Sequence, residues 1–381
     1  AYERFFDRFP DAENWDDSSL RLAEALFELE RYEEAAEVLQ RVIDESVLAD
    51  RVFRARLLRA RCLVRMGSAE EADQLITTLK DEAPIYNQLG DVTLIGAGAG
   101  RVETGYSLLL PRHGPVVGVV AFLDSRRNPD SGKPVEVSFD AEALRLGLAV
   151  LHITTGNPLD FLFEIADLES LTSRVEHALA ANDLEDLPIH FAGLSLGGTR
   201  ALRLLIFLKQ MDGEHRLKVG AVAVVDAPLD MERLWRSEGH AIGRNFHPAA
   251  ADEGRWVRYL LEEHLGGDPD QSRDHYAEYS PYSYSQPGGG NAVHLRDIPV
   301  RAYHEPDVDW WIEHRRKSYY DMNSLDLAAL IAELQASGNE RAQLITTNDR
   351  REGADTGASP HTWSLVDDTD LAEWFVQQSK D

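Results

Sequence analysis

The stretch HFAGLSLGGTR, residues 190–200, sets a serine between glycines in the pattern Gly193-Leu194-Ser195-Leu196-Gly197. A Gly-x-Ser-x-Gly pattern is expected by chance in roughly one chain in ten of this length, so the pattern is weak by itself. Its flanks make it more specific, because a strand-like run (PIHFAG) leads in and a helix-like run (GGTRALRLLIFLKQM) leads out. A strand, a sharp turn and a helix in this order present a serine as a nucleophile. We therefore predict that Ser195 is a nucleophile that faces the free amides at the start of the helix.

The sequence around this stretch alternates strand-like and helix-like segments. Runs of Val, Ile and Ala that do not alternate with polar residues indicate strands buried on both faces, and eight such runs follow residue 86: 91–98, 106–112, 115–124, 148–156, 188–195, 219–228, 299–307 and 342–349. From residue 140 onward helical stretches separate the runs, such as 166–181, 198–211 and 324–337. This alternation predicts a parallel sheet with helices on both faces. The first strands follow one another without helices, so we expect that edge of the sheet to be antiparallel.

A second glycine-rich stretch, LIGAGAGRVETG at residues 94–105, also follows a strand-like run. In a dinucleotide-binding loop a third glycine and a helix would follow, but Arg101 takes the place of that glycine and another strand pattern comes next. We therefore predict a hairpin loop here and no nucleotide cofactor.

The N-terminal part of the chain, residues 18–80, has helical spacing of apolar residues and no strand signal. It also resembles itself, because LFELERYEEAAEVL (26–39) aligns with LVRMGSAEEADQLI (63–76) at a shift of 37 residues. This period is similar to that of tetratricopeptide repeats, which are helix pairs that stack on one another. An ordinary helical extension remains the alternative. We expect these helices to mediate binding of a protein partner or self-association.

The composition excludes several classes of partner and site. The chain has 66 acidic and 39 basic residues, a formal net charge of −27, which argues against binding to duplex nucleic acid or to anionic membranes. Cys62 is the single cysteine, so an intrachain disulfide and a cysteine-rich metal site are excluded, and we expect Cys62 to be a small core residue. No apolar run reaches the roughly 18 residues of a membrane helix, and no signal-peptide pattern is present. We expect a soluble protein and leave its compartment open: cytoplasmic, or secreted or periplasmic if a signal peptide has been removed.

A nucleophilic serine needs a base, and the base needs an orienting acid. The expected chain order is serine, acid, histidine. His361, in the stretch ASPHTWSLVDD, comes after the last predicted strand and before the last helix, and it is our candidate base. For the acid we favour Asp307, just past the strand at 299–304, and keep Asp309 and then Asp226 as alternatives.

The oxyanion of a tetrahedral intermediate needs two hydrogen-bond donors. We expect the backbone N–H of Leu196 to supply one of them, because Leu196 follows the nucleophile. The second should come from the turn after the strand 115–124, at Leu123 or Asp124. No metal or organic cofactor is expected to take part.

Together these residues resemble the α/β-hydrolase superfamily over about residues 86–381. The resemblance rests on Gly193–Gly197, on Glu305-Pro306-Asp307 and on Pro360-His361, and the stretches EPDVDWW and SPHTWSLVD are similar to those of a bacterial subgroup of esterase-like hydrolases. It implies an α/β fold with a mostly parallel eight-stranded sheet and helices on both faces. A small all-α region, residues 1–85, precedes this catalytic domain.

Residues 229–295 are expected to form an insertion, or lid, between two late strands. The candidate pocket residues are Leu194, Tyr282, Tyr284 and Trp310, and the insertion also contains Tyr276 and Tyr279. For Trp310 and Trp311 we favour packing against the acid turn over binding of substrate.

The leading functional hypothesis is a serine hydrolase, specifically a carboxylesterase acting on a small or medium acyl ester as its small-molecule substrate. A peptidase of the same fold is the second hypothesis. The third is an interaction protein whose repeat-like helices bind a partner and whose hydrolase domain is weak.

Overall fold

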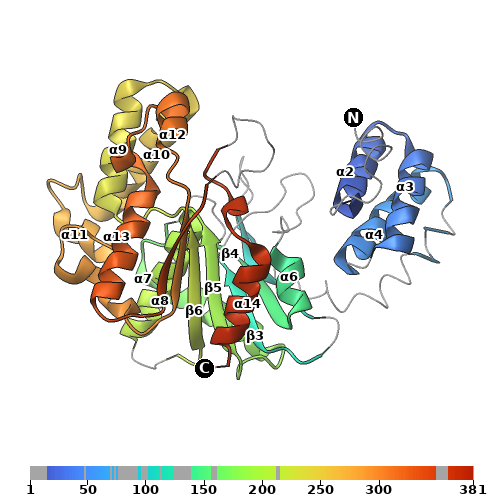
Figure 1. The fold of residues 1–381 in the computed structure, drawn as a ribbon, viewed down its shortest axis with the longest axis horizontal. Helices are drawn as coiled ribbons and strands as arrows, with labels where there is room; N and C mark the ends of the chain where they lie inside the picture. Colours follow the sequence, from blue (N-terminus) through green and yellow to red (C-terminus); the bar gives the residue numbers. More distant parts are fainter. Residues whose placement is uncertain are drawn as a thin grey trace. The chain divides into compact units, whose positions relative to one another are not determined.

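The computed structural model describes residues 15–46, 49–68, 71–72, 74–75, 93–95, 102–111, 114–123, 139–155, 161–211, 215–348 and 359–380. The chain divides into two compact units, Ala1–Asn87 and Gln88–Asp381 (Figure 1). The predicted boundary between residues 85 and 86 falls outside the described residues and stays a prediction. No helix in the described part of the chain is long and apolar enough to cross a membrane.

The first unit contains the helices α2 (Trp15–Glu28), α3 (Tyr32–Glu45) and α4 (Ala49–Arg65), each packed against the next. Their shared core contains Cys62, as predicted, and is otherwise built from Leu20, Ala23, Leu26, Ala35, Ala36, Leu39, Val42, Ala55 and Leu58. The alanines let paired helices approach closely, because they add little bulk at the contact.

The sequence repeat is also a repeat of backbone structure. Glu30 and Gly67, which are 37 residues apart, both have a positive φ, of 58° and 81°. The turn hydrogen bonds recur at the same shift: Arg31 N to Leu26 O and Ser68 N to Leu63 O at 2.9 Å, then Ala35 N to Arg31 O and Ala72 N to Ser68 O at 3.0 Å. The helical segment is therefore a repeat, as its self-similarity predicted, and not an ordinary extension.

The second unit is built on one eight-stranded sheet of order β1-β2-β4-β3-β5-β6-β7-β8. The strands are β1 (Thr93–Ile95), β2 (Val102–Leu109), β3 (Gly118–Phe122), β4 (Leu148–Thr155), β5 (Pro188–Leu194), β6 (Lys218–Val225), β7 (Val300–His304) and β8 (Ala342–Thr346). All eight overlap the predicted strands. The sheet is parallel from β4 to β8.

The other edge of the sheet is antiparallel, as expected. β1 pairs with β2, and β2 pairs with β4, both in antiparallel register. Ile95 lies opposite Val102, so the glycine-rich stretch connects a hairpin. Its residues 96–101 lie outside the described part of the chain. The prediction of a hairpin was therefore correct, because the two strands that flank the stretch pair directly with each other.

Helices cover both faces of the sheet (Figure 1). One face carries α6 (Phe139–Arg145) and α14 (Asp368–Gln378), which pack on each other and, for α14, on β3 and β6. The other face carries α7 (Ile165–Ala180), α8 (Leu196–Gln210) and α13 (Asn323–Ala336), whose apolar sides merge with the sheet into the main core. Of the central strands, β3 is fully buried between the two layers, and β5 and β6 are buried except at their first residues, as their unbroken apolar runs predicted.

Between β6 and β7 the chain forms α9 (Met231–Arg244), α10 (Pro248–Leu265), α11 (Arg273–Tyr279) and the 3₁₀ segment η1 (Pro287–Leu295). This is the segment predicted as an insertion. α12 (Val308–Arg315) and η2 (Tyr319–Asp321) follow β7, and η3 (Trp363–Leu365) precedes α14. A buried ion pair ties the insertion to the sheet layer, because Arg233 at the start of α9 donates to both carboxylate oxygens of Asp326 on α13, at 2.8 and 2.6 Å.

Candidate functional site

Ser195 lies at the turn between β5 and α8, with φ 55° and ψ −129°. These angles suit the first central residue of a type II′ turn, a position dominated by glycine. The turn is held from both sides: Ser195 N donates to Val225 O at 2.8 Å, and Ser195 O accepts from Gly198 N at 3.0 Å and Thr199 N at 3.2 Å. The serine is therefore in a strained backbone conformation that its neighbours fix, as the nucleophile turn predicted from the sequence requires.

The glycines around the serine have different reasons to be there. A Cβ on Gly193 would lie 2.3 Å from Gly197 C and 2.5 Å from Gly198 N, so strand and helix meet only because Gly193 has no side chain. A Cβ on Gly198 would lie 2.9 Å from the Ala227 side chain. A Cβ on Gly197 would meet nothing within 4 Å. Close packing therefore explains Gly193 and Gly198 but not Gly197.

Leu196 is the first residue of α8, so its N–H has no acceptor within the helix. The first turn of α8 carries no acidic residue that would compete for the positive end of the helix dipole. This is the geometry expected of an oxyanion donor, and the role of Leu196 remains a prediction.

The acid that contacts the predicted base is Asp226. Its Oδ2 lies 2.5 Å from His361 Nδ1. Asp226 directly follows β6, and its backbone is fixed because its N–H donates to Tyr303 O at 3.0 Å and its carbonyl accepts from Asn323 Nδ2 at 2.9 Å. Because Ser195 N binds the carbonyl of Val225, the serine and Asp226 sit at the ends of two neighbouring strands.

The favoured acid, Asp307, is not the partner of His361 in the structure. Its Oδ1 accepts from Trp310 N at 2.8 Å and caps the N-terminus of α12. Asp309 lies within the first turn of the same helix. Glu305 is buried and accepts from Thr347 Oγ1 at 3.2 Å. The preference for Asp307 over Asp226 was therefore wrong in geometry, because Asp307 serves as a helix cap.

The electrostatics of His361 favour the protonated ring. Burial alone would lower the pKa of His361, but the charge of Asp226 and the hydrogen bond to it outweigh burial, and the pKa is raised above its ordinary value. Glu253, on α10, raises the pKa further, whereas Lys317 lowers it. Lys317 is itself paired with Glu238 of α9 at 3.1 Å. The sequence did not indicate Glu238, Glu253 or Lys317, since nothing in their local pattern shows that α9, α10 or the segment after α12 lies near His361.

A second histidine supports the acid side of the site. His304, the last residue of β7, is buried, and its Nε2 lies 2.8 Å from Thr346 Oγ1. Burial lowers the pKa of His304, against the opposing charge of Asp226. A neutral His304 beside Asp226 leaves His361 as the cationic partner of that carboxylate.

No hydrogen bond joins Ser195 Oγ to His361 among the described residues. Such contacts in enzymes without bound substrate are often long and shorten when substrate binds. The arrangement supplies a strained serine, a histidine and a carboxylate on the same edge of the sheet, in chain order Ser195, Asp226, His361.

The second predicted oxyanion donor falls at the end of β3. Leu123 is fully buried, and its carbonyl accepts from Arg200 Nη1 at 3.2 Å. Asp124, the alternative donor, lies outside the described residues.

The insertion packs beside the serine turn. Leu196 lies against an apolar cluster that joins the insertion to the segment after β4: Phe161, Met231, Leu234, Val257, Leu261, Leu265, Tyr276 and Tyr279. Tyr276 and Tyr279 are buried in this cluster, so they are packing residues of the insertion.

The predicted pocket residues are spread over three environments. Leu194 is the buried last residue of β5, and Tyr282 is part of the main core. Tyr284 is exposed and lies edge-on against Tyr282, with ring centres 4.9 Å apart. Trp310 is buried and stacks on His314, with ring centres 4.8 Å apart. Their part in binding substrate stays a prediction.

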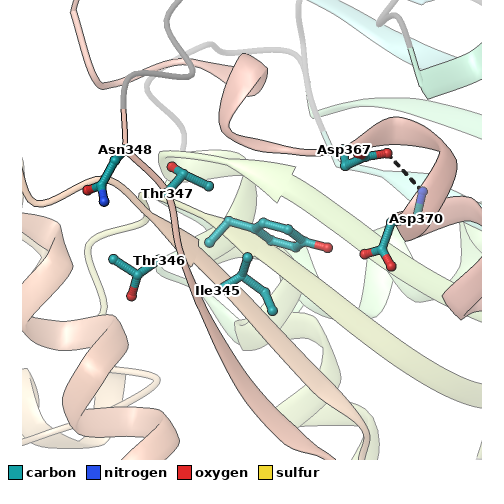
Figure 2. A pocket seen from close by; sticks show the side chains of 7 residues that line it. Ile345, Thr346, Thr347, Asn348, Asp367 and Asp370 are labelled. Carbon is teal, nitrogen blue, oxygen red and sulfur yellow. Dashed lines mark hydrogen bonds between the residues drawn. The ribbon is translucent and has the colours of Figure 1, made fainter.

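One described hollow, of about 470 Å³, lies between the end of β8 and the start of α14 (Figure 2). It is lined by Tyr303, Ile345, Thr346, Thr347, Asn348, Asp367 and Asp370. The Asp367 carboxylate has a structural role: it accepts a hydrogen bond from Asp370 N at 3.1 Å and caps the N-terminus of α14. None of the predicted site residues lines this hollow.

Comparisons with known proteins give one family match and several similar folds. A family model described as tetratricopeptide repeat matches residues 17–46. The sequence matches no curated protein.

Three of the solved structures that match this chain are a peptidase, an esterase and a lipase. An acylaminoacyl peptidase of Pyrococcus horikoshii is 12% identical, with a TM-score of 0.48, over 80% of this chain and 44% of that protein. An esterase of Pyrobaculum calidifontis is 15% identical, with a TM-score of 0.44, over 91% of this chain and 96% of that one. A soluble variant of monoglyceride lipase from Saccharomyces cerevisiae is 12% identical, with a TM-score of 0.43, over 77% of this chain and 96% of that one. The chain thus spans less than half the length of the peptidase.

The strand order and the serine turn, taken by themselves, define the architecture of the second unit. A mixed eight-stranded sheet with two antiparallel strands at one edge carries a serine on a sharp turn between β5 and α8. The described chain therefore combines a tetratricopeptide-like helical segment with an α/β-hydrolase fold.

Proposed function

We propose that this protein is a serine hydrolase, and specifically a carboxylesterase acting on a small or medium acyl ester. The observation that carries the proposal is the 2.5 Å contact between His361 Nδ1 and Asp226 Oδ2, made by a histidine that follows the last strand. A histidine held through Nδ1 presents Nε2 as the base, which is the orientation that nucleophilic catalysis needs.

In the proposed reaction Ser195 Oγ attacks the ester carbonyl carbon while His361 Nε2 takes the hydroxyl proton. The resulting oxyanion is stabilised by the N–H of Leu196 and a second donor from the end of β3. Collapse of the intermediate breaks the bond to the leaving alcohol, which receives the proton from His361. Water then attacks the acyl-serine by the same steps and releases the acid. Asp226 stabilises the imidazolium in both halves.

Labelling with a fluorophosphonate tests the nucleophile directly. The wild-type protein should be labelled once, at Ser195, and Ser195→Ala should neither be labelled nor hydrolyse p-nitrophenyl esters. A panel of acyl chain lengths, set against peptidyl amides, then separates an esterase from a peptidase. Hydrolysis that survives in purified Ser195→Ala would contradict the proposal.

We also propose that the helical unit binds a protein, either a partner or a second copy of this chain. The match at residues 17–46 supports this, as do three exposed apolar side chains at the repeated turns, Leu29, Val64 and Met66. Sedimentation velocity of the full chain tests self-association. Leu29→Glu should lower the sedimentation coefficient if copies associate through this end, whereas Ile165→Glu, an exposed position on α7, serves as the control.

A further inference from the structure

Asp226 is held in a backbone conformation that favours glycine. Its φ is 38°, in the left-handed region, and it directly follows β6. A residue with a side chain stays in this region only where its surroundings fix it. Two contacts do so, because the Asp226 N–H donates to Tyr303 O at 3.0 Å and the Asp226 carbonyl accepts from Asn323 Nδ2 at 2.9 Å. With both backbone groups fixed, the direction of the Asp226 side chain toward His361 Nδ1 is fixed as well.

The amide of Asn323 can take only one orientation at this position. Asn323 is the first residue of α13, and its Oδ1 accepts from Arg233 Nη2 at 3.1 Å. A guanidinium only donates hydrogen bonds and a carbonyl only accepts them. The oxygen of the amide must therefore face Arg233 of α9, and its nitrogen must face the carbonyl of Asp226. A carboxylate of the same shape would supply the acceptor but not the donor.

Arg233 is itself fixed by a buried carboxylate. Its side chain is 9% exposed, and it donates to both carboxylate oxygens of Asp326, at 2.8 and 2.6 Å. Asp326 Oδ2 also accepts from the N–H groups of Leu229 and Asp230, at 2.8 and 3.0 Å. The first turn of α13 therefore holds both ends of the segment 226–230, which leads from the acid into the insertion.

We infer that Asn323 is a positioning residue for the acid of the proposed site: it holds Asp226 in the left-handed conformation and so holds its carboxylate on His361. Among the described residues no hydrogen bond joins Asn323 to Ser195 or to His361, so its effect passes through the backbone of Asp226. Because the same amide binds Arg233, the position of the acid also depends on the first turn of the insertion helix α9. This inference rests on the proposed hydrolase function.

The segment after the other end of α13 offers a matched control. Asn339 is buried, and its Nδ2 donates to the carbonyls of Leu295 and Ile298, at 3.1 and 2.7 Å. Its Oδ1 accepts from Arg341 N at 3.0 Å. The Asn339 amide therefore makes the same kinds of bond as the Asn323 amide, but to the segment before β7 and not to the acid.

The test compares Asn323→Ala, Asn323→Asp and Asn339→Ala in the full chain. The readouts are kcat and KM for a p-nitrophenyl ester, the pH dependence of kcat/KM, the rate of fluorophosphonate labelling and the melting temperature. Asn323→Ala should lower kcat by about 10²-fold, because a small misplacement of a reacting group costs about this much. It should leave KM within about threefold of the wild type. Asn323→Asp keeps the acceptor for Arg233 but loses the donor to Asp226, so kcat should fall as far.

The pH profile separates positioning from a general loss of stability. Asp226 raises the pKa of His361 through its charge and its hydrogen bond. When Asp226 shifts away from His361, the midpoint of the rise in kcat/KM with pH should move to lower pH in Asn323→Ala. Asn339→Ala should lower the melting temperature, with kcat and the midpoint near the wild-type values.

A double-mutant cycle with Asp226→Asn tests whether Asn323 acts through the acid. The Asp226→Asn background has already lost the charge and the tautomer control, so adding Asn323→Ala should lower kcat and the labelling rate by less than about threefold. A further loss of about tenfold or more in this background would overturn the inference. Equal effects of Asn323→Ala and Asn339→Ala on kcat would do the same.

Failure of both Asn323 variants to fold, while Asn339→Ala folds, would also overturn the inference, because Asn323 would then hold the domain together. A wild-type protein that fluorophosphonate does not label would instead contradict the hydrolase proposal.

Discussion

His361 Nδ1 lies 2.5 Å from Asp226 Oδ2, although 135 residues separate the two in the chain. Asp226 follows β6, which is hydrogen-bonded to β5, the strand that Ser195 follows, whereas His361 comes after β8, two strands further along the sheet. Asp226 therefore lies one strand from Ser195, and His361 follows a strand on the other side of Asp226. The Asp226 carboxylate therefore contacts Nδ1 of the imidazole, and Nε2 lies on the other side of the ring.

The identity of the acid gives the first prediction. Asp226→Asn keeps the shape of the side chain but removes its charge and reverses the preferred tautomer of His361, so kcat should fall on the order of 10⁴-fold. Steady-state ester hydrolysis measures this, with fluorophosphonate labelling of Ser195 as a second readout.

Asp307→Ala is the matched control, because Asp307 caps α12. It should lose about 1 kcal/mol of unfolding free energy and keep kcat within about threefold of the wild type. A larger loss of kcat in Asp307→Ala than in Asp226→Asn would reverse the assignment.

The raised pKa of His361 predicts that activity rises with pH while the stability of the fold decreases. Only the neutral ring accepts a proton, so kcat/KM should rise with pH through a midpoint above the ordinary histidine value of about 6.5. The folded state binds the His361 proton more tightly than the unfolded chain does. Its contribution to stability is therefore complete below about pH 6.5 and lost as pH rises through the folded pKa.

A pH–rate profile and denaturant unfolding at several pH values test both signs. In His361→Gln the stability difference between pH 6 and pH 9 should shrink. An acid limb of the rate profile below pH 6 would show that burial, and not Asp226, dominates the pKa.

The backbone strain at Ser195 predicts an unusual stabilising substitution. With φ 55° and ψ −129°, any side chain at this position is strained, by roughly 1–3 kcal/mol. Glycine relieves the strain but adds freedom to the unfolded chain, which offsets up to about 1 kcal/mol. The unfolding free energy of Ser195→Gly should therefore be about 1 kcal/mol larger than that of Ser195→Ala. Both variants should be inactive. Equal stability of the two would mean that the turn is relaxed.

The sheet and the serine turn were predictable because their signals are local. Unbroken apolar runs mark strands buried on both faces, and a strand that runs into Gly193 and a helix that leaves Gly198 leave few alternatives. The repeat was likewise predictable, since LFELERYEEAAEVL (26–39) aligns with LVRMGSAEEADQLI (63–76). Boundaries moved by a few residues, as expected where turns end an element.

The choice of acid was not predictable from such signals. Asp226 and Asp307 both follow buried strands whose ends meet at the same edge of the sheet. Which carboxylate faces His361 depends on the path of the chain after residue 358, and no periodic pattern encodes that path. One signal was available: Asp307 stands three residues before Trp310 at the start of a helical run, which is the position of an N-cap.

The pocket residues were uncertain for a related reason. A tyrosine has an apolar body and a polar tip, so it suits a core and a binding site equally well. Tyr282 joined the main core while Tyr284, two residues later, stayed exposed. Only the packing of the insertion separates the two outcomes.

The glycines of the serine turn support a final prediction, because the structure gives them unequal roles. Gly193→Ala would drive a Cβ to within 2.3 Å of Gly197 C, and neither backbone can move without distorting the turn. It should cost about 3 kcal/mol of unfolding free energy and abolish fluorophosphonate labelling of Ser195. Gly197→Ala meets nothing within 4 Å and lies in the first turn of α8, where alanine is the better helix former. It should keep labelling and gain up to about 1 kcal/mol. Chemical denaturation of the two variants at one pH, alongside labelling, distinguishes them. A loss of stability in Gly197→Ala as large as that in Gly193→Ala would mean that the pattern is kept for backbone freedom at both positions and not for the close approach of β5 and α8.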